Sequence, residues 1–216
     1  WLASVVKKTN ALQPDLIAIT GDLAEGSVAQ FGMEVEPLRE LIAPHGVFFV
    51  TGNHEYFHDL RGWLRLLDDF GIRVLRNERV RIEGEECSFD LAGVDDHDGG
   101  RIAEGHGPDL EKALKDRDPN RAVVLLAHQP RIMEEASRQG VGLVLSGHTH
   151  GGQIWPFSYL VYLQQPYVRG LKELGNTKLY LSSGTGFWGP PMRLGTTAEI
   201  ALITLRTKPT TAASSP

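Results

Sequence analysis

Short apolar runs and longer stretches with helical periodicity alternate along most of the chain. Short apolar runs are typical of strands that are buried on both faces. They predict strands at residues 16–20, 47–50, 123–126 and 143–145. Apolar residues three or four positions apart predict helices. These lie at residues 2–12, 35–42, 59–70, 109–117 and 132–139. The alternation of strands and helices is typical of an α/β fold.

A different pattern begins in the middle of the chain. Apolar and polar residues alternate in residues 80–82 and 89–91, on either side of a turn at residues 84–86, which predicts antiparallel strands. Residues 95–108 are rich in Asp, Gly and His and predict a loop, and residues 154–169 are aromatic without clear periodicity. Closing strands are predicted at residues 179–181 and 199–205.

Composition sets limits on this picture. The chain has 216 residues and a net charge of -5 at pH 7, which argues against a nucleic-acid surface held by bulk electrostatics. Its length suits one domain, which we place at residues 1–206, before a disordered tail at residues 207–216. A single cysteine excludes an internal disulfide. No apolar run reaches the roughly 18 residues that a membrane span needs, so we expect a soluble domain. The sequence does not identify its cellular compartment.

Residue types that bind metals follow four of the predicted strands. They are Asp22, Asn53, His128, His148 and His150. Ligand sites of α/β sheets gather at the carboxyl ends of the strands, so we expect these side chains to share one crevice. His148 and His150 are two positions apart, which places both imidazoles on the same side of an extended backbone. The sequence therefore predicts a metal site where the strands end.

The chemistry of this set limits the metal and the reaction. A carboxylate, an amide oxygen and imidazoles without thiolate suit Mn, Fe, Zn or Ni better than a structural zinc. Asp22 can bridge two cations, because a carboxylate has two oxygens. Two cations about 3.5–4 Å apart polarise a phosphoryl group and turn a bridging water into a hydroxide nucleophile. His54, next to Asn53, is placed to protonate the departing alkoxide.

Each of these residues also has an ordinary structural explanation. Asp22 after a glycine suits a turn or a helix cap. Asn53 and His128 suit an Asx turn and a capped loop, and His54 can simply shape its loop. These explanations do not account for metal-ligand chemistry at the ends of all four strands. We therefore predict a metal-dependent phosphoester hydrolase.

Four sequence blocks resemble, in order, the motifs of the calcineurin-like metallophosphoesterases. They are Gly21-Asp22, Gly52-Asn53-His54-Glu55, Ala127-His128 and Gly147-His148-Thr149-His150. The residues around these blocks resemble one branch of that family. The branch includes transmembrane proteins with a metallophosphoesterase domain and bacterial membrane- or wall-associated phosphodiesterases. The similarity spans nearly the whole chain.

The resemblance implies a fold of two packed mixed β-sheets flanked by helices. It also implies that Asp22 bridges two divalent ions (Mn, Fe, Zn or Mg). Asn53, His128 and His148 would hold one ion, and His150 would help to hold the other. His54 would assist the leaving group. Phosphodiesters or lipid-linked phosphates are the expected substrates, and a catalytically weak or inactive scaffold with this fold is the alternative.

The sequence departs from the family pattern at its beginning. The family opens with a strand that carries Asp-x-His, whereas Trp1 begins in a helical pattern and Asp15 and His45 do not fit the motif. We therefore expect an N-terminally truncated domain that lacks its first strand, with one metal well held and a second held weakly. Members of the branch are often tethered to membranes by upstream segments.

Two further features bear on the substrate. Arg193 is our candidate for binding the substrate phosphate, because a guanidinium forks onto its oxygens, and an ordinary surface arginine is the alternative. The second feature is a set of aromatic residues that predicts either an apolar lip for a phospholipid or membrane, or simple core packing. The set is Trp155, Phe157, Tyr159, Tyr162, Tyr167, Phe187 and Trp188. The expected partner is a small phosphoester or a phospholipid, and the oligomeric state stays open.

The loop at residues 95–108 leaves two interpretations open. Asp95, Asp96, His97 and His106 either face the substrate or belong to a solvated loop. Two other hydrolase classes are excluded by their motifs: glycines follow His150 where a metallo-β-lactamase needs H-x-H-x-D-H, and Gly-x-Ser-x-Gly does not occur.

Overall fold

Two β-sheets form the framework of the molecule. The computed structural model describes residues 1–84, 88–102, 104–156 and 158–207. The smaller sheet is parallel and contains, in order, β1 (Ile17–Ile19), β2 (Val47–Phe49) and β3 (Arg73–Val74). The larger sheet has the order β4-β5-β6-β7-β9-β8. Its strands are β4 (Glu78–Glu83), β5 (Ser88–Gly93), β6 (Ala122–Leu126), β7 (Leu143–Ser146), β8 (Gly170–Leu174) and β9 (Thr177–Leu181).

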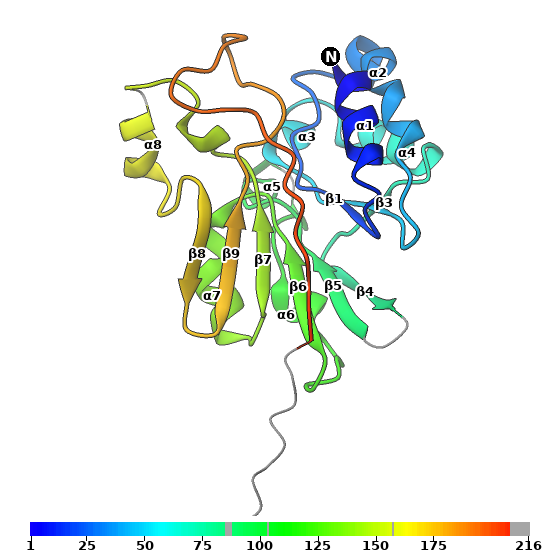
Figure 1. Ribbon diagram of the computed structural model, residues 1–216, viewed down its shortest axis with the longest axis vertical. Coiled ribbons are helices and arrows are strands. Elements are labelled where there is room, and N and C mark those ends of the chain that lie inside the picture. The colour runs from blue at the N-terminus through cyan, green and yellow to red at the C-terminus, as the bar shows by residue number, and fades with distance from the viewer. Residues whose placement is uncertain (85–87, 103, 157, 208–216) are drawn as a thin grey trace, which may run out of the picture.

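The larger sheet is mixed. Strands β5, β6, β7 and β9 run parallel, whereas β4 and β8 pair antiparallel at the two edges. The smaller sheet packs against one face of the larger sheet, as Figure 1 shows. The predicted α/β fold of two packed sheets is therefore confirmed.

Helices cover the outer faces of both sheets. Those near the smaller sheet are α1 (Leu2–Ala11), α2 (Val28–Val35), η1 (Glu36–Glu40), α3 (Asn53–His58) and α4 (Leu60–Asp69). Those on the larger sheet are α6 (Leu110–Ala113), η2 (Pro130–Ile132) and α7 (Met133–Arg138). Three more, α5 (Gly99–Ile102), η3 (His150–Gly152) and α8 (Ser158–Gln164), lie beyond the carboxyl ends of its parallel strands, where Figure 1 labels α5 and α8. Among the residues described, no helix combines the length and hydrophobicity that crossing a bilayer requires.

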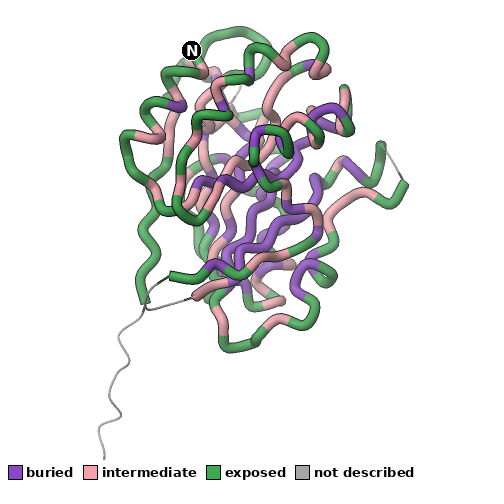
Figure 2. The backbone as a smooth tube through the Cα atoms, turned by 90° about the vertical axis from the view of Figure 1, so that its right-hand side faces the viewer, coloured by how far each residue is buried: buried purple, intermediate pink, exposed green. Residues whose placement is uncertain are grey.

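Three apolar clusters hold these layers together. Phe49 packs with Trp63 of α4 under the helices of the smaller sheet. Leu125 packs with Met133 of α7 on the outer face of the larger sheet. The third cluster lies between the sheets and includes Leu126. Because strands β6 and β7 are covered on both faces, they read as nearly unbroken apolar runs. Figure 2 shows the buried residues concentrated in the middle of the molecule.

Several predicted elements have different bounds. The helix predicted at residues 35–42 overlaps α2 only at Val35, because residues 36–40 form the 3-10 helix η1 and residues 41–42 are not helical. Helix α2 begins at Val28, where Ser27 and Gln30 form a capping box with a hydrogen bond of 3.0 Å from the Ser27 N–H to the Gln30 Oε1. The helix predicted at residues 109–117 is shortened to α6. Helix α8 and strand β8 form where no regular element was predicted.

The strand predicted at residues 199–205 is wrong. These residues all lie in the described part of the chain and join neither sheet. Their apolar side chains are largely exposed, with Leu202 at 62%. A strand needs a neighbour for its backbone hydrogen bonds, so an apolar pattern alone does not make one. Residues 85 and 86 of the predicted turn and residues 208–216 of the predicted tail lie outside the described residues.

Gly93, at the end of β5, lies where the two sheets touch. A Cβ at this position would collide with the side chain of Leu75 and lie 2.7 Å from Cγ1 of Val50. We predict that Gly93→Ala lowers the free energy of unfolding by about 1–3 kcal/mol, because the packed sheets must separate to admit it. Urea denaturation measures this change. Gly142→Ala is the control, since its Cβ would meet only the Val123 carbonyl at 3.5 Å. Equal midpoints for the two variants would contradict the prediction.

Candidate metal centre

The predicted ligands follow the carboxyl ends of β1, β2, β6 and β7. Asp22 follows β1, Asn53 begins α3 directly after β2, and His128 follows β6. His148 and His150 lie in the loop after β7 with φ angles of 72° and 50°, so the extended backbone predicted for this pair is wrong. The strands of each pair are parallel neighbours, so their carboxyl ends lie at the same edge of the two packed sheets.

Two glycines allow the loops to approach one another. A Cβ on Gly52 would lie 2.6 Å from the backbone nitrogen of Asp22 and would also collide with its carboxylate. A Cβ on Gly21 would lie 2.5 Å from the backbone nitrogen of Gly52 and 2.9 Å from Nδ1 of His128. Only glycine fits at either position, because any side chain would push the ligand-bearing loops apart.

Glu55 fixes the backbone around Asp22. Its carboxylate is 1% exposed and accepts hydrogen bonds from the N–H groups of Asp22 (3.1 Å), Leu23 (2.7 Å) and Gly52 (2.6 Å). Burial and the nearby charge of Asp22 raise the pKa of Glu55 to about 7. Asp22 Oδ1 accepts a further hydrogen bond from the N–H of His54 at 3.0 Å. These contacts leave Oδ2 of Asp22 directed at the histidines.

Three of the predicted ligands form a compact group. Oδ2 of Asp22 lies 2.9 Å from Nε2 of His128, and Nδ1 of His148 lies 3.0 Å from the same Nε2. One ligand atom from each residue lies within 4.8 Å of the others. Nδ1 of His128 lies 2.6 Å from the Thr20 carbonyl oxygen, which can only accept. His128 therefore carries a proton on Nδ1, and its Nε2 faces the group as a ligand atom.

The other two predicted ligands offer buried atoms that lack a partner. Oδ1 of Asn53 and Nδ1 of His150 have no hydrogen-bond partner among the residues described. Leaving a buried polar atom unpaired costs about 1–3 kcal/mol. Divalent cations would satisfy such atoms and would balance the Asp22 charge, so the donor set fits metal binding. The set contains nitrogen and oxygen without thiolate, as the metals predicted from the sequence require.

The charge states of the histidines follow from their surroundings. Desolvation lowers the pKa of His148 to about 3, with the charge of His128 adding to it, so His148 is neutral and has a free lone pair. Desolvation and the charge of Arg193 lower the pKa of His150 to about 4. Desolvation acts in the same direction on His128, but Asp22 outweighs it and raises the pKa to about 9. Burial would raise the pKa of Asp22, yet His128 and His54 hold it well below its usual range.

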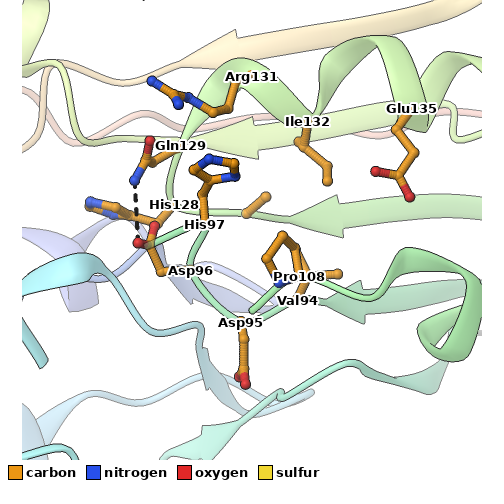
Figure 3. Close-up of a pocket in the computed structure, with 11 residues that line it drawn as sticks. Val94, Asp95, Asp96, His97, Pro108, His128, Gln129, Arg131, Ile132 and Glu135 are labelled. Carbon is orange, nitrogen blue, oxygen red and sulfur yellow. Dashed lines mark hydrogen bonds between the residues drawn. The ribbon is translucent and has the colours of Figure 1, made fainter. Parts of the chain in front are cut away.

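A cavity of about 200 Å³ adjoins the group and shares His128 with it. The loop after β5 and the turn after β6 line it, as Figure 3 shows. Asp96 is 1% exposed, and its Oδ1 accepts hydrogen bonds from the Gln129 amide at 3.2 Å and from the Asp98 N–H at 2.8 Å. Its Oδ2 has no partner among the residues described. The sequence analysis missed Gln129, although its position directly after a predicted ligand was a signal.

The solvated-loop interpretation is wrong for the two aspartates at the start of this loop. Asp95 is 3% exposed and receives two hydrogen bonds from the guanidinium of Arg76, at 2.8 and 2.6 Å. Asp96 is buried as well. Their polarity alone suggested solvent, whereas the fold buries both.

Arg193 lies beside the group but points its donors at main-chain carbonyls. It donates to the carbonyl oxygens of His150 (3.0 Å), Ser183 (2.7 Å), Gly184 (3.3 Å) and Gly186 (3.0 Å). Its role in binding a substrate phosphate stays a prediction.

The aromatic residues of the predicted lip are mostly exposed. The exposed ones are Trp155, Tyr159, Tyr162, Phe187 and Trp188, at 54–66%. Tyr167 instead packs against the core, and Phe157 lies outside the described residues. Simple core packing is therefore wrong for the exposed members. Tyr159 and Tyr162 lie on α8, which packs on η3, the short helix that contains His150.

Residues 2–152 match the family model for calcineurin-like phosphoesterases. The chain belongs to this family. It is 41% identical over 215 residues to a transmembrane protein with a metallophosphoesterase domain from Bos taurus, covering 94% of this chain and 48% of that protein. It is 40% identical over 198 residues to an uncharacterized metallophosphoesterase from Aquifex aeolicus, covering 91% of this chain and 74% of that protein. The chain spans about half the length of several curated relatives it matches.

Solved structures of other proteins share the fold of this chain. The sulfate thiohydrolase SoxB from Thermus thermophilus superposes with a TM-score of 0.57 at 18% identity, covering 83% of this chain and 36% of that chain. The NAD nucleotidase from Haemophilus influenzae superposes with a TM-score of 0.56 at 17% identity, covering 84% of this chain and 43% of that chain.

The raised pKa of His128 makes metal binding depend on pH. Below pH 9 the metal-free protein carries a proton on Nε2 of His128, and a cation must displace it. We predict that the Mn²⁺ affinity rises about tenfold from pH 7 to pH 8, with about one proton released per ion, since His148 is already neutral. Calorimetry in buffers of different ionisation enthalpy measures both quantities. His45→Ala, at an exposed histidine, is the control and should change neither. An affinity independent of pH over this interval would contradict the prediction.

Proposed function

We propose that this phosphoesterase hydrolyses phosphoesters at the centre formed by Asp22, His128 and His148. The observation that carries the proposal is the approach of their ligand atoms to within 4.8 Å of one another. A bound divalent ion supplies Lewis acidity and a hydroxide nucleophile at neutral pH. Family membership supports the reaction type, because the matching model describes phosphoesterases.

The ligands divide into two groups. We infer that Asn53, His128 and His148 hold one ion together with Asp22, and that His150 contributes to a second, more weakly held ion. Of the predicted ligands, only Asp22 and His150 are assigned to this second ion. The candidate metals are Mn, Fe, Zn and Mg. Two ions held with equal strength by this chain would contradict the assignment.

His54 is the proposed proton donor to the leaving group. Its Nε2 lies 4.0 Å from Oδ2 of Asp22, and its side chain is 15% exposed, so a substrate can reach it. The hydrogen bond from its N–H to Asp22 fixes the backbone and places the ring at the rim of the centre. A proton passed from the imidazole to the departing oxygen would make an alcohol, which leaves more easily than an alkoxide.

Phosphodiesters or lipid-linked phosphates are the proposed substrates. The exposed aromatic surface formed by Trp155, Tyr159, Tyr162, Phe187 and Trp188 supports an apolar substrate or a membrane interface. The Bos taurus relative is named as a transmembrane protein, which is consistent with work near a bilayer.

The alternative is a scaffold that keeps the fold without turnover. It stays open because, of the predicted ligands, only Asp22 and His150 are assigned to the second ion. The position of His54 beside Asp22 favours the enzyme, since a scaffold has no use for a proton donor at this place.

The proposed role of His54 depends on the leaving group. We predict that His54→Ala lowers kcat about 10²- to 10⁴-fold for alkyl phosphodiesters, because an alkoxide must be protonated. The loss should be much smaller for bis-p-nitrophenyl phosphate, whose leaving group needs no proton. Steady-state kinetics with Mn²⁺ compares the two substrates. His58→Ala, at an exposed neighbour, is the control. The role is refuted if both substrates are hydrolysed at the wild-type rate.

The aromatic surface can be tested without knowing the substrate. We predict that the protein floats with anionic phospholipid vesicles and that Trp155→Ala combined with Trp188→Ala reduces the bound fraction severalfold, because both indoles are more than half exposed. Ile42→Ala, at an exposed apolar residue of another surface, should leave it unchanged. If the wild-type protein does not float with the vesicles, the proposed membrane interface is wrong.

A further inference from the structure

The loop that carries two of the metal ligands has an unfavourable backbone. His148, His150 and Gln153 have φ angles of 72°, 50° and 40°. Such positive φ angles are costly for residues with a side chain and persist only where surrounding contacts enforce them. Contacts with other segments must therefore hold this loop in its conformation.

The segment at residues 183–194 supplies the contacts that hold the loop. The Gln153 side chain accepts a hydrogen bond from the Trp188 N–H at 2.7 Å and donates to the Trp188 carbonyl at 2.6 Å. The Leu194 N–H donates to the Gln153 carbonyl at 2.9 Å. These bonds tie residues that follow β9 to the loop that follows β7.

Arg193 makes the contact nearest to a metal ligand. Its Nη1 donates to the His150 carbonyl at 3.0 Å. Its Nη2 donates to Ser183 at 2.7 Å, and its Nε donates to Gly186 at 3.0 Å. A guanidinium presents its N–H groups in a rigid planar fork, so these bonds fix the carbonyls relative to one another. Every nitrogen of the guanidinium thus has a main-chain partner, which disfavours a grip on phosphate.

We propose that Arg193 is a positioning residue of the metal centre, which sets the backbone and hence the imidazole of His150. The proposal rests on the proposed function only in taking His150 as a metal ligand. The buried Nδ1 of His150, which has no partner among the described residues, is the atom that this arrangement presents. Removing the guanidinium would free the His150 carbonyl and let the strained backbone relax, which would carry the imidazole away from its place.

A double-mutant cycle tests this coupling. The dissociation constant of the second, more weakly held Mn²⁺, to which His150 is assigned, is measured by calorimetry for wild type, Arg193→Ala, His150→Ala and the double variant. We expect Arg193→Ala to raise the constant at least about tenfold, as loss of a contact that orients a ligand commonly does. In the His150→Ala background the same substitution should change it less than about twofold, because the residue through which Arg193 acts is gone.

Two further variants define the mechanism. Arg193→Lys should fail to restore the affinity, because one ammonium group cannot reproduce the planar fork. Arg138→Ala, at an exposed arginine of α7, is the matched control and should bind Mn²⁺ like wild type. If Arg193→Ala does not fold, as judged by its thermal unfolding, Arg193→Lys takes its place in the cycle.

Three outcomes would overturn the proposal. The first is an unchanged Mn²⁺ constant in Arg193→Ala and Arg193→Lys. The second is a fold change in the dissociation constant that is the same for Arg193→Ala in the wild-type and in the His150→Ala background. The third is that Arg193→Ala weakens the binding of inorganic phosphate but not of Mn²⁺, and that Arg193→Lys restores phosphate binding. This result is expected for a direct contact between Arg193 and phosphate. The cycle measures binding and not turnover, so a coupled protein that hydrolyses no phosphoester would refute the proposed function and leave this inference standing.

Discussion

The contact between Asp22 and His128 joins the two sheets at the candidate metal centre. Asp22 extends from the smaller sheet and His128 from the larger, and their ligand atoms lie 2.9 Å apart. Because His128 is buried, water screens this attraction little. The contact requires the glycines at positions 21 and 52, since a side chain on either would separate the loops. The metal centre is therefore a product of sheet packing.

The same packing leaves the site with unpaired polar atoms. Asn53, His150 and Asp96 each hold a buried atom without a partner among the described residues. A fold tolerates such costs only when the rest of the core offsets them. Here the clusters on both faces of the larger sheet supply that stability. The apolar clusters thus supply the stability that keeps these unpaired polar atoms in place.

Local patterns identified the central strands, the order of the ligand-bearing loops and the family. Strands β1, β2, β6 and β7 could be predicted because burial on both faces leaves unbroken apolar runs in the sequence. The group of Asp22, His128 and His148 could be predicted because ligands gather at the carboxyl ends of strands. Both inferences depend on neighbours in sequence, or on a general rule of sheet geometry.

Local patterns did not predict the contacts between segments that are distant in the sequence. The segment at residues 199–205 has the apolar pattern of a strand but joins neither sheet. The sequence left Asp95 open between a substrate-facing and a solvated position, and the fold pairs it with Arg76. Arg193 was a candidate for the substrate phosphate, and the fold directs it at the carbonyls around His150. The sequence by itself determined which residues could bind a metal, because their chemistry and spacing are local properties. Only the tertiary structure decided which polar groups they meet, because hydrogen-bond partners far apart in the chain are chosen by packing.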